Sequence, residues 1–285
     1  MIKKRKDGHL VKMDPLFKLI PLIMETREDS QVFIKEEISI QAIDEYIKKK
    51  QEEGINLGYM HIFYSALVKT MKKRPKLNQF IMRGRLYRRD AITISLAVKK
   101  NMSLEGEETI VKVDFTGDES PEQIKEILNS QIQKEKDSNS EDNDMDVFVK
   151  VMDKIPQGFL RLLIKFLMYL DTINLMPYSL IKVSPFHASA FVTNMGSLGI
   201  DAINHHLYKF GTVGIFLAIG KKGRRIVEKK GKFLEEKTMT VAFVSDERVC
   251  DGFYYASALK QFFKYLRKPE LLDEVEIIDE DVVNL

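Results

Sequence analysis

The feature that most constrains this chain is a buried strand that breaks into a charged turn and then a helix, at residues 241–253. The run Val241–Val244 is short, apolar and rich in β-branched residues, as a covered strand should be. Beyond Gly252, apolar residues recur at helical spacing as far as Leu266. We call residues 245–252, which carry the charges, the corner. A compact charged loop between two core elements is a common place for an active site, although an N-cap with salt bridges leaves the same pattern.

Composition sets the class of protein. With 285 residues, 44% of them hydrophobic, the chain can build a substantial core in a single domain. Its net charge of +3 does not predict a nucleic-acid partner. One cysteine and no signal-peptide pattern predict a reducing, cytoplasmic location. We expect neither a membrane partner nor a metal site, because the most apolar long segment, 159–176, contains charges and no metal-ligand spacing occurs.

Hydrophobic periodicity predicts the order of elements. We expect strands at 31–40, 78–87 (a hairpin), 91–98, 109–115, 188–192, 211–220 and 238–244. We expect helices at 43–50, 59–73, 122–133 and 156–175, and one after Gly252. Three other segments are predicted as a strap over the core (1–30), a mobile polar loop (134–146) and an acidic tail (272–285). The very apolar helix 156–175 is typical of a core or subunit contact.

The corner resembles the signature of the CoA-dependent acyltransferases, which include chloramphenicol acetyltransferase and the acyltransferase cores of 2-oxoacid dehydrogenase complexes. The family motif is His-x-x-x-Asp-Gly; Asp251 and Gly252 match its end, and Glu247 stands where the histidine belongs. A second segment, Thr193–Gly196, resembles the Ser-Asn-Leu-Gly of the dehydrogenase enzymes. Two motifs in the right order make the resemblance more specific than one, and it extends over about 31–271.

The resemblance implies a fold and an assembly. The fold is a chloramphenicol-acetyltransferase-like two-layer α/β sandwich, a mixed sheet covered by helices. Family members are trimers with the site between subunits, so we expect a homotrimer in which Thr193 of one chain faces Glu247 of the next. Residues 1–285 are predicted as one catalytic domain without a lipoyl domain or lipoyl group of its own.

The resemblance also implies roles for site residues. Glu247 takes the position of the base, Thr193 provides the hydroxyl that steadies an oxyanion, and Asp251 organises the corner through an arginine. The candidate arginines are Arg5, Arg27 and Arg248. Thr193 has an alternative role, since a threonine also caps or closes a Gly-rich turn.

Coenzyme A or acyl-CoA is the implied cofactor. The residues expected to contact it are Asn194, Gly196, Arg248 and Gly252, and Gly252 is also expected to permit a close turn. The basic clusters 83–89 and 221–225 either meet CoA phosphates or are solvated hairpin tips.

Glu247 is a weaker base than histidine. Proton transfer from a thiol to glutamate is about 3 kcal/mol harder than to histidine, from pKa values of roughly 4.3 and 6.5. Burial can raise a carboxyl pKa and recover this difference. Three interpretations remain open: a retuned base, a site with reduced or lost acyl transfer, and a structural loop residue.

Other reactive side chains are candidates to replace the motif histidine. His187 is predicted to lie on the same strand face as Thr193. The six residues between them span about 20 Å at the usual rise per strand residue. His61, His205 and His206 are expected to have ordinary polar or packing roles, and Cys250 to be a small buried filler.

The sequence therefore leaves two functions open. The first is transfer of an acyl group between CoA, or a dihydrolipoamide-type thiol, and a small acceptor, with activity reduced if Glu247 is a poor base. The second is a non-catalytic trimeric binding or assembly protein that keeps the fold.

Overall fold

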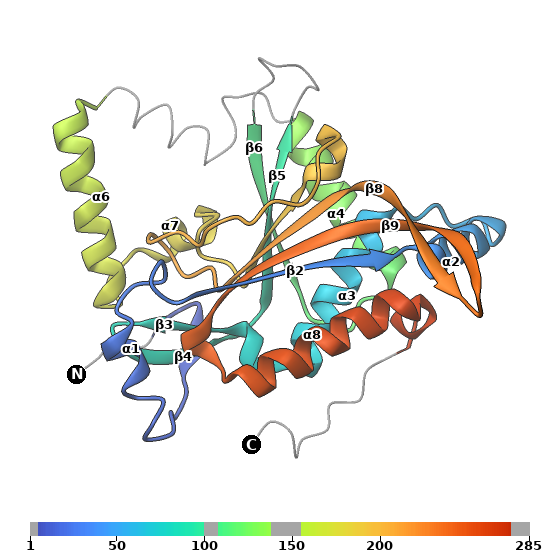
Figure 1. Cartoon of the computed structure of the whole chain (residues 1–285). Coiled ribbons are helices and arrows are strands. Elements are labelled where there is room, and N and C mark those ends of the chain that lie inside the picture. Colours follow the sequence, from blue (N-terminus) through green and yellow to red (C-terminus); the bar gives the residue numbers. More distant parts are fainter. Residues whose placement is uncertain (1–4, 100–107, 138–154, 275–285) are drawn as a thin grey trace.

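The protein is built around a six-stranded mixed sheet with helices packed on one face (Figure 1). The computed structural model describes residues 5–99, 108–137 and 155–274. The strand order is β2-β9-β8-β7-β5-β6, and a smaller sheet has the order β1-β4-β3. The two-layer α/β architecture predicted from the sequence is therefore confirmed.

The elements have the following bounds. The strands are β1 (Gly8–Leu10), β2 (Gln31–Ser39), β3 (Gln79–Met82), β4 (Arg85–Arg89), β5 (Ile92–Lys99), β6 (Glu108–Phe115), β7 (Ala190–Asn194), β8 (Ile215–Lys229) and β9 (Lys232–Asp246). The α-helices are α1 (Ile20–Ile23), α2 (Gln41–Glu52), α3 (Tyr59–Lys73), α4 (Pro121–Asp137), α6 (Gln157–Thr172), α7 (Tyr178–Val183) and α8 (Gly252–Arg267). The 3-10 helices are η1 (Pro75–Asn78), η2 (Met195–Leu198), η3 (Glu247–Val249) and η4 (Pro269–Leu272).

Strand β7 lies at the centre of the large sheet and runs parallel to both neighbours, β5 and β8. Thr193 of β7 is the register partner of Ala218 of β8, which is in turn opposite Ala242 of β9. Strand β9 runs antiparallel to β8 and to β2. This register fixes the distance between the two expected halves of the site, because Thr193 lies on β7 and Glu247 follows β9.

The two faces of the sheet are covered differently. On one face, α2, α3, α4 and α8 bury the main hydrophobic core. On the other, Phe191, Phe216 and Val244 form a smaller apolar cluster with Leu207 and Val213, which precede β8. Side chains alternate along a strand, so Thr193 shares the face of Phe191 and not that of the main core.

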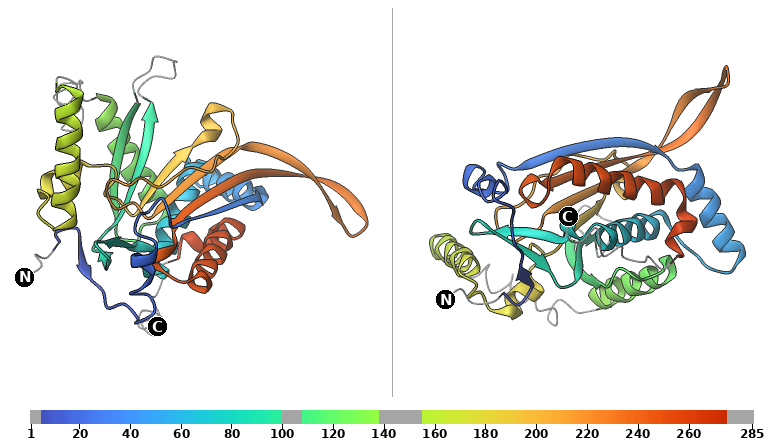
Figure 2. Two further views of the ribbon diagram at one scale, coloured as in Figure 1. Left: turned by 60° about the vertical axis from the view of Figure 1, so that its left-hand side comes forward. Right: turned by 90° about the horizontal axis from the view of Figure 1, so that it is seen from below.

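Strands β8 and β9 continue well beyond the sheet as a projecting hairpin (Figure 2). The sequence predicted this segment as a basic hairpin, and the structure extends its pairing as far as Lys229 and Lys232. Large apolar side chains near the tip, Ile226 and Phe233, are more than three-quarters exposed.

Several predicted boundaries were wrong. The strand expected at 211–220 begins at Ile215 and continues to Lys229. Helix α4 continues to Asp137, into the segment expected as a polar loop; the remainder of that loop, and the tail from 275 onward, lie outside the described residues. The helix expected at 156–175 is instead α6 followed by the short α7, because Asn174 adopts a left-handed backbone and Pro177 begins a new helix. The strand expected at 188–192 begins two residues later.

Helix α6 stands at the edge of the molecule, away from the sheet (Figure 1). Its side chains Phe159, Leu162 and Phe166 are more than half exposed, so much of its apolar surface is not buried within the chain. Within the part of the chain that the structure describes, no helix is sufficiently long and apolar to span a bilayer.

The first described residues lead into β1, an edge strand of the small sheet. Strand β1 pairs with β4, and Arg5 is buried and donates to Asp171 (2.9 Å) and Asp7 (2.8 Å). Asp171 is near the end of α6, so this ion pair fastens the first segment to a helix more than 160 residues away. The prediction that residues 1–30 form one strap remains a proposal.

Candidate active site

The corner is held by a buried ion cluster centred on Asp246. Arg248 donates to both carboxylate oxygens, Nε to Oδ1 at 2.8 Å and Nη2 to Oδ2 at 2.7 Å. Arg27 Nε lies 3.7 Å from the same carboxylate, and Ser30 Oγ donates to it at 3.0 Å. A bidentate arginine pair is geometrically specific, so this cluster fixes the end of β9 against the start of β2.

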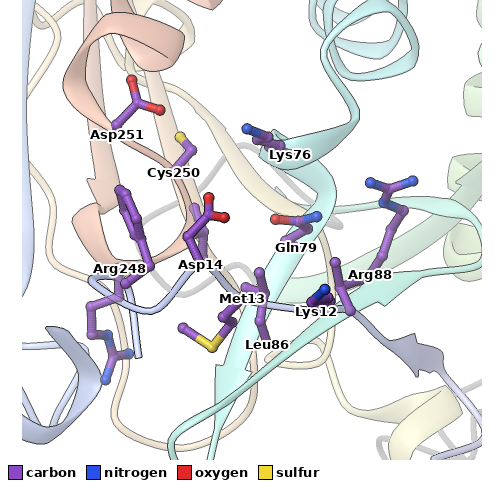
Figure 3. A pocket seen from close by; sticks show the side chains of 13 residues that line it. Lys12, Met13, Asp14, Lys76, Gln79, Leu86, Arg88, Arg248, Cys250 and Asp251 are labelled. Carbon is purple, nitrogen blue, oxygen red and sulfur yellow. The ribbon is translucent and has the colours of Figure 1, made fainter. Parts of the chain in front are cut away.

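Arg248 is already engaged by the protein. Besides Asp246, its guanidinium donates to the carbonyl oxygens of Met24 (3.2 Å) and Glu25 (3.0 Å), and the side chain is 3% exposed. Figure 3 shows the guanidinium pointing away from Cys250 and Asp251. These contacts favour a structural role over the expected contact with CoA.

Asp251 caps a helix. Its Oδ1 accepts a hydrogen bond from the backbone N–H of Tyr254 at 2.8 Å, as an N-cap residue of α8 does. The three arginines proposed for it pair elsewhere, Arg27 and Arg248 with Asp246 and Arg5 with Asp171. The carboxylate that organises the corner is thus Asp246, which sequence reasoning missed although it stands in the same charged run.

Gly252 does not have the role expected of it. It is exposed at the start of α8, its φ is not in the left-handed region, and a Cβ built there meets no atom within 4 Å. A close turn therefore does not require glycine at this position.

Glu247 is exposed in the single chain. Its backbone N–H donates to Ser30 O at 2.8 Å, which fixes its position on η3 while the side chain faces outward. A carboxyl group becomes a useful base at neutral pH through burial. Such burial of Glu247 requires a second molecule over the corner.

The second half of the expected site is the loop at 193–199, which we call the Gly loop. Asn194 Oδ1 accepts from Ser197 N at 3.2 Å and so caps η2. Gly196 lies against β8, because a Cβ at this position would be 2.6 Å from Gly220 O. The turn is therefore closed by Asn194 and Gly196, not by Thr193.

The Thr193 hydroxyl is half-buried and weakly engaged. It donates to Met195 Sδ at 3.6 Å, and a thioether sulfur is a poor acceptor. The structure thus disfavours the alternative in which Thr193 closes the turn, and leaves its hydroxyl available to a stronger acceptor.

One chain does not bring the two halves together. Thr193 and Glu247 are separated by two strand spacings and by the five residues from Ala242 to Glu247. A spacing of about 4.8 Å and a rise of about 3.3 Å per residue give roughly 19 Å between their Cα atoms.

His187 lies outside β7, so the strand position predicted for it is wrong. It is buried, with Nε2 3.1 Å from Asp171 Oδ2 and Nδ1 2.8 Å from Ser184 Oγ. Burial lowers the pKa of its imidazole more than the Asp171 carboxylate raises it. It joins the network that holds the first segment and α6, consistent with a structural role.

The other histidines have distinct surroundings. His61 Nδ1 accepts from Gly58 N–H at 2.9 Å, which confirms a polar role at the start of α3. His205 and His206 lie between η2 and β8, with ring centroids 4.6 Å apart. His205 is half-buried and stacks on Phe216 at 3.8 Å.

A pocket of about 430 Å³ lies beside the corner (Figure 3). Lys12, Lys76 and Arg88 line it together with Asp14 and Asp251. The thiol of Cys250 also lines it, but burial, aided by the charge of Asp251, raises its pKa to about 12. The thiol is therefore protonated at neutral pH, which agrees with the expected filler role.

A second pocket, of about 620 Å³, lies where the hairpin leaves the sheet. It is lined by residues of α2, Tyr59 at the start of α3, and four cations, Lys48, Lys222, Arg224 and Lys237. Lys222 Nζ lies 4.0 Å from the centroid of the Tyr59 ring. Of the basic cluster 221–225, Lys222 and Arg224 thus line a cavity and Arg225 does not. Both arginines are paired, Arg224 with Glu235 at 3.1 Å and Arg225 with Glu236 at 2.8 Å.

A protein-family comparison matches the part of the chain that contains both motifs. Residues 182–273, which contain the Gly loop and the corner, match the family model of the 2-oxoacid dehydrogenases acyltransferase catalytic domain. Over these residues the chain is similar to the acyltransferase catalytic domain of the 2-oxoacid dehydrogenases.

Solved structures of this acyltransferase fold cover most of the chain. A probable dihydrolipoamide acetyltransferase from Listeria monocytogenes is 15% identical, with a TM-score of 0.58 over 90% of this chain and 94% of that one. The dihydrolipoamide acetyltransferase of Azotobacter vinelandii is 13% identical, with a TM-score of 0.56 over 92% and 93%. A chloramphenicol acetyltransferase is 10% identical, with a TM-score of 0.53 over 91% and 99%. No curated protein sequence matches the chain.

Proposed function

We propose that the protein transfers an acyl group between CoA, or a dihydrolipoamide-type thiol, and a small acceptor. The observation that carries this proposal is the Gly loop. Its turn is closed by Asn194 and Gly196, which leaves the Thr193 hydroxyl to stabilise a tetrahedral oxyanion. A serine figures with a histidine and an asparagine in the catalytic mechanism of the Azotobacter vinelandii acetyltransferase, and Thr193 is the hydroxyl this chain offers.

The pocket at the base of the hairpin suits the CoA phosphates. Lys222 and Arg224 lie on the same face of β8, two residues apart, and both line the pocket. The pairing of β8 with β9 has a bulge between Ile219 and Lys222, so Lys222 shares the helix-covered face of the sheet with Met239. Thr193 lies on the other face, so the pocket is a candidate phosphate site that the sheet separates from Thr193.

The proposal includes a homotrimer with its site between subunits. Within one chain Thr193 and Glu247 are too far apart to contact one substrate, and Glu247 is exposed. A second chain placed over the Gly loop would bring its corner toward Thr193 and bury the Glu247 that this corner carries. The cytoplasmic location stays a prediction from the single cysteine.

The test is turnover of acetyl-CoA with dihydrolipoamide and other small thiols or alcohols as acceptors. We expect Thr193→Ala to lower kcat by about 10²- to 10³-fold, the usual cost of removing one oxyanion donor. Thr193→Ser keeps the hydroxyl and should retain most activity. An unchanged rate in Thr193→Ala removes Thr193 from the mechanism.

A second function, a non-catalytic trimeric binding or assembly protein, is favoured by Glu247 itself, because a carboxylate stands at the position of the motif histidine and is exposed. Glu247→His separates the two functions. Gain of acyl transfer in a silent protein indicates a site that lacks only its base. No gain, with no CoA binding by calorimetry, indicates a scaffold.

A further inference from the structure

The face of the sheet opposite the main core holds a histidine, His205. His205 stacks on Phe216 with ring centroids 3.8 Å apart and planes 1° from parallel. Phe216 is the register partner of Phe191 on β7 and of Val244 on β9. Its Cα is therefore about 8 Å from that of Thr193 and about 11 Å from that of Glu247, by strand spacing and rise. His205, stacked over Phe216, therefore lies on the face of the sheet that carries Thr193.

The backbone around His205 is tied to the corner. Leu207 N donates to Gln31 Oε1 at 2.7 Å, and Arg27 Nη1 donates to Tyr208 O at 2.8 Å. Gln31 is the register partner of Asp246, the residue before Glu247. Because Arg27 also meets Asp246, the segment 205–208 is fixed to the ion cluster that positions the corner.

The hydrogen bonding of His205 prepares it to accept a proton. Its Nδ1 lies 2.9 Å from His206 O, and a carbonyl oxygen only accepts, so Nδ1 carries the hydrogen in the neutral ring. Nε2 then holds the free lone pair. We infer that His205 is the general base of the proposed acyl transfer, the role that the motif histidine has in the family. This inference rests on the proposed acyl transfer and departs from it in one respect, since the base then belongs to the same chain as Thr193.

The step balances with residues of one chain. His205 Nε2 takes the proton from the acceptor thiol or hydroxyl, and the acceptor atom bonds to the acyl carbon while Thr193 donates to the oxyanion. The carbon–sulfur bond of the thioester then breaks, and the imidazolium returns its proton to the departing thiolate. Glu247 is not required as a base in this scheme. The large difference between the pKa of a carboxyl group and that of a thiol therefore no longer matters.

The surroundings of His205 also set its charge. The rings of His206 and Tyr208 lie 4.6 and 5.8 Å from it, centroid to centroid. Burial lowers the pKa of His205, and the charge of His206 adds to this, against the opposing effect of the hydrogen bond to the His206 carbonyl. The ring is therefore mostly neutral at pH 7, as a base must be before it reacts. Acidification below about pH 6.5 should protonate it and lower kcat/KM.

The decisive variant is His205→Asn, whose side-chain N–H can still donate to His206 O while the basic nitrogen is lost. We expect kcat to fall by about 10²-fold or more with KM changed little, since general-base catalysis contributes about 10²- to 10⁴-fold. The residual kcat/KM of this variant should no longer fall at acidic pH. Added imidazole should restore activity to His205→Gly, which a merely structural role would not allow.

The matched control is His206→Asn, an exposed neighbour whose loss should leave the rate near neutral pH close to that of the wild type and move the acidic limb only to higher pH, because the charge of His206 no longer lowers the pKa of His205. Wild-type turnover with an equally active His205→Asn overturns the inference and leaves the proposed function standing. Glu247→Gln with a loss as large as that expected of His205→Asn overturns it too. A wild-type protein that turns over no acyl-CoA contradicts the proposed function, and the inference with it.

Discussion

Two glycines of the expected site differ in the space around them. At Gly196 a Cβ would be 2.6 Å from Gly220 O, whereas at Gly252 it would meet nothing within 4 Å. We therefore expect Gly196→Ala to push the Gly loop off β8 and to lower the free energy of unfolding by about 1–3 kcal/mol, the usual cost of overpacking. Gly252→Ala should be neutral or stabilising by up to about 1 kcal/mol, because alanine costs less entropy in a helix.

Urea denaturation of the two glycine variants measures both changes. Gly196→Ala should also lose acyl-CoA turnover, because the backbone that carries Thr193 moves with the loop. Equal stability of the two variants would show that the Gly loop does not pack on Gly220 as described.

Asp251 is expected to act through its hydrogen bond to Tyr254 N. Asp251→Ala should lower the free energy of unfolding by about 1 kcal/mol, the typical cost of losing an N-cap. Asp251→Asn should cost little, because asparagine caps helices as well as aspartate does. Denaturation of both variants tests this. A large loss in Asp251→Asn would instead show that the negative charge is paired, as the family resemblance implied.

Among the helices and strands, the sequence predicted correctly those bounds that neighbouring residues determine. Helix α3 has the bounds expected of it, because apolar residues recur on one face and Gly58 and Pro75 delimit the segment. Helix α7 was missed because residues 159–176 contain no Gly or Pro to mark a break, and the left-handed backbone of Asn174 that ends α6 is not visible in a pattern. The strands of the projecting hairpin are charged on both faces beyond the sheet, so no alternation indicated their length.

The hairpin element offers a test of CoA binding. Lys222 and Arg224 line the pocket at its base, and Arg225 on the opposite face pairs with Glu236. Lys222→Gln with Arg224→Gln should raise KM for acetyl-CoA by about 10-fold with kcat unchanged, because each removed cation costs a modest, screened interaction with phosphate. The effect should shrink at high salt, where the Debye length is short.

Arg225→Gln is the matched control for the hairpin, since it removes one charge from the same strand without touching the pocket. Steady-state kinetics at low and high ionic strength give the comparison. If Arg225→Gln raises KM as much as the double variant does, net charge and not the pocket determines affinity.

At the scale of the molecule, buried charges connect segments far apart in sequence. Arg5, Asp171 and His187 join the first residues to α6 and to the approach to β7, and Asp246 joins β9 to residues 24–30. The sequence named Arg5 and His187 as candidates but not their partner Asp171, because ion pairs between distant segments leave no periodic signal. Thr193 and Glu247 were found by motif, while His205 needed its stacking on Phe216 and the sheet register to place it on the face of Thr193.

The last prediction decides whether the site is built within one chain or between two. If Thr193 and His205 act together in one subunit, each chain of a trimer carries a complete pair. Mixed trimers of Thr193→Ala and His205→Asn, formed by dissociation and reassociation, should then contain no intact pair and show no activity above that of either variant. Light scattering after size exclusion confirms that the mixed species are trimers.

The opposite geometry gives the opposite result. If Thr193 of one subunit works with His205 of its neighbour, some contacts in a mixed trimer join an unchanged Thr193 to an unchanged His205, and activity returns to a substantial fraction of the wild-type rate. Wild type mixed with the Thr193→Ala, His205→Asn double variant provides the reference, because a pair within one chain keeps activity proportional to the wild-type share. The roughly 8 Å between Thr193 and Phe216 in one chain, against roughly 19 Å to Glu247, is why we expect the first result.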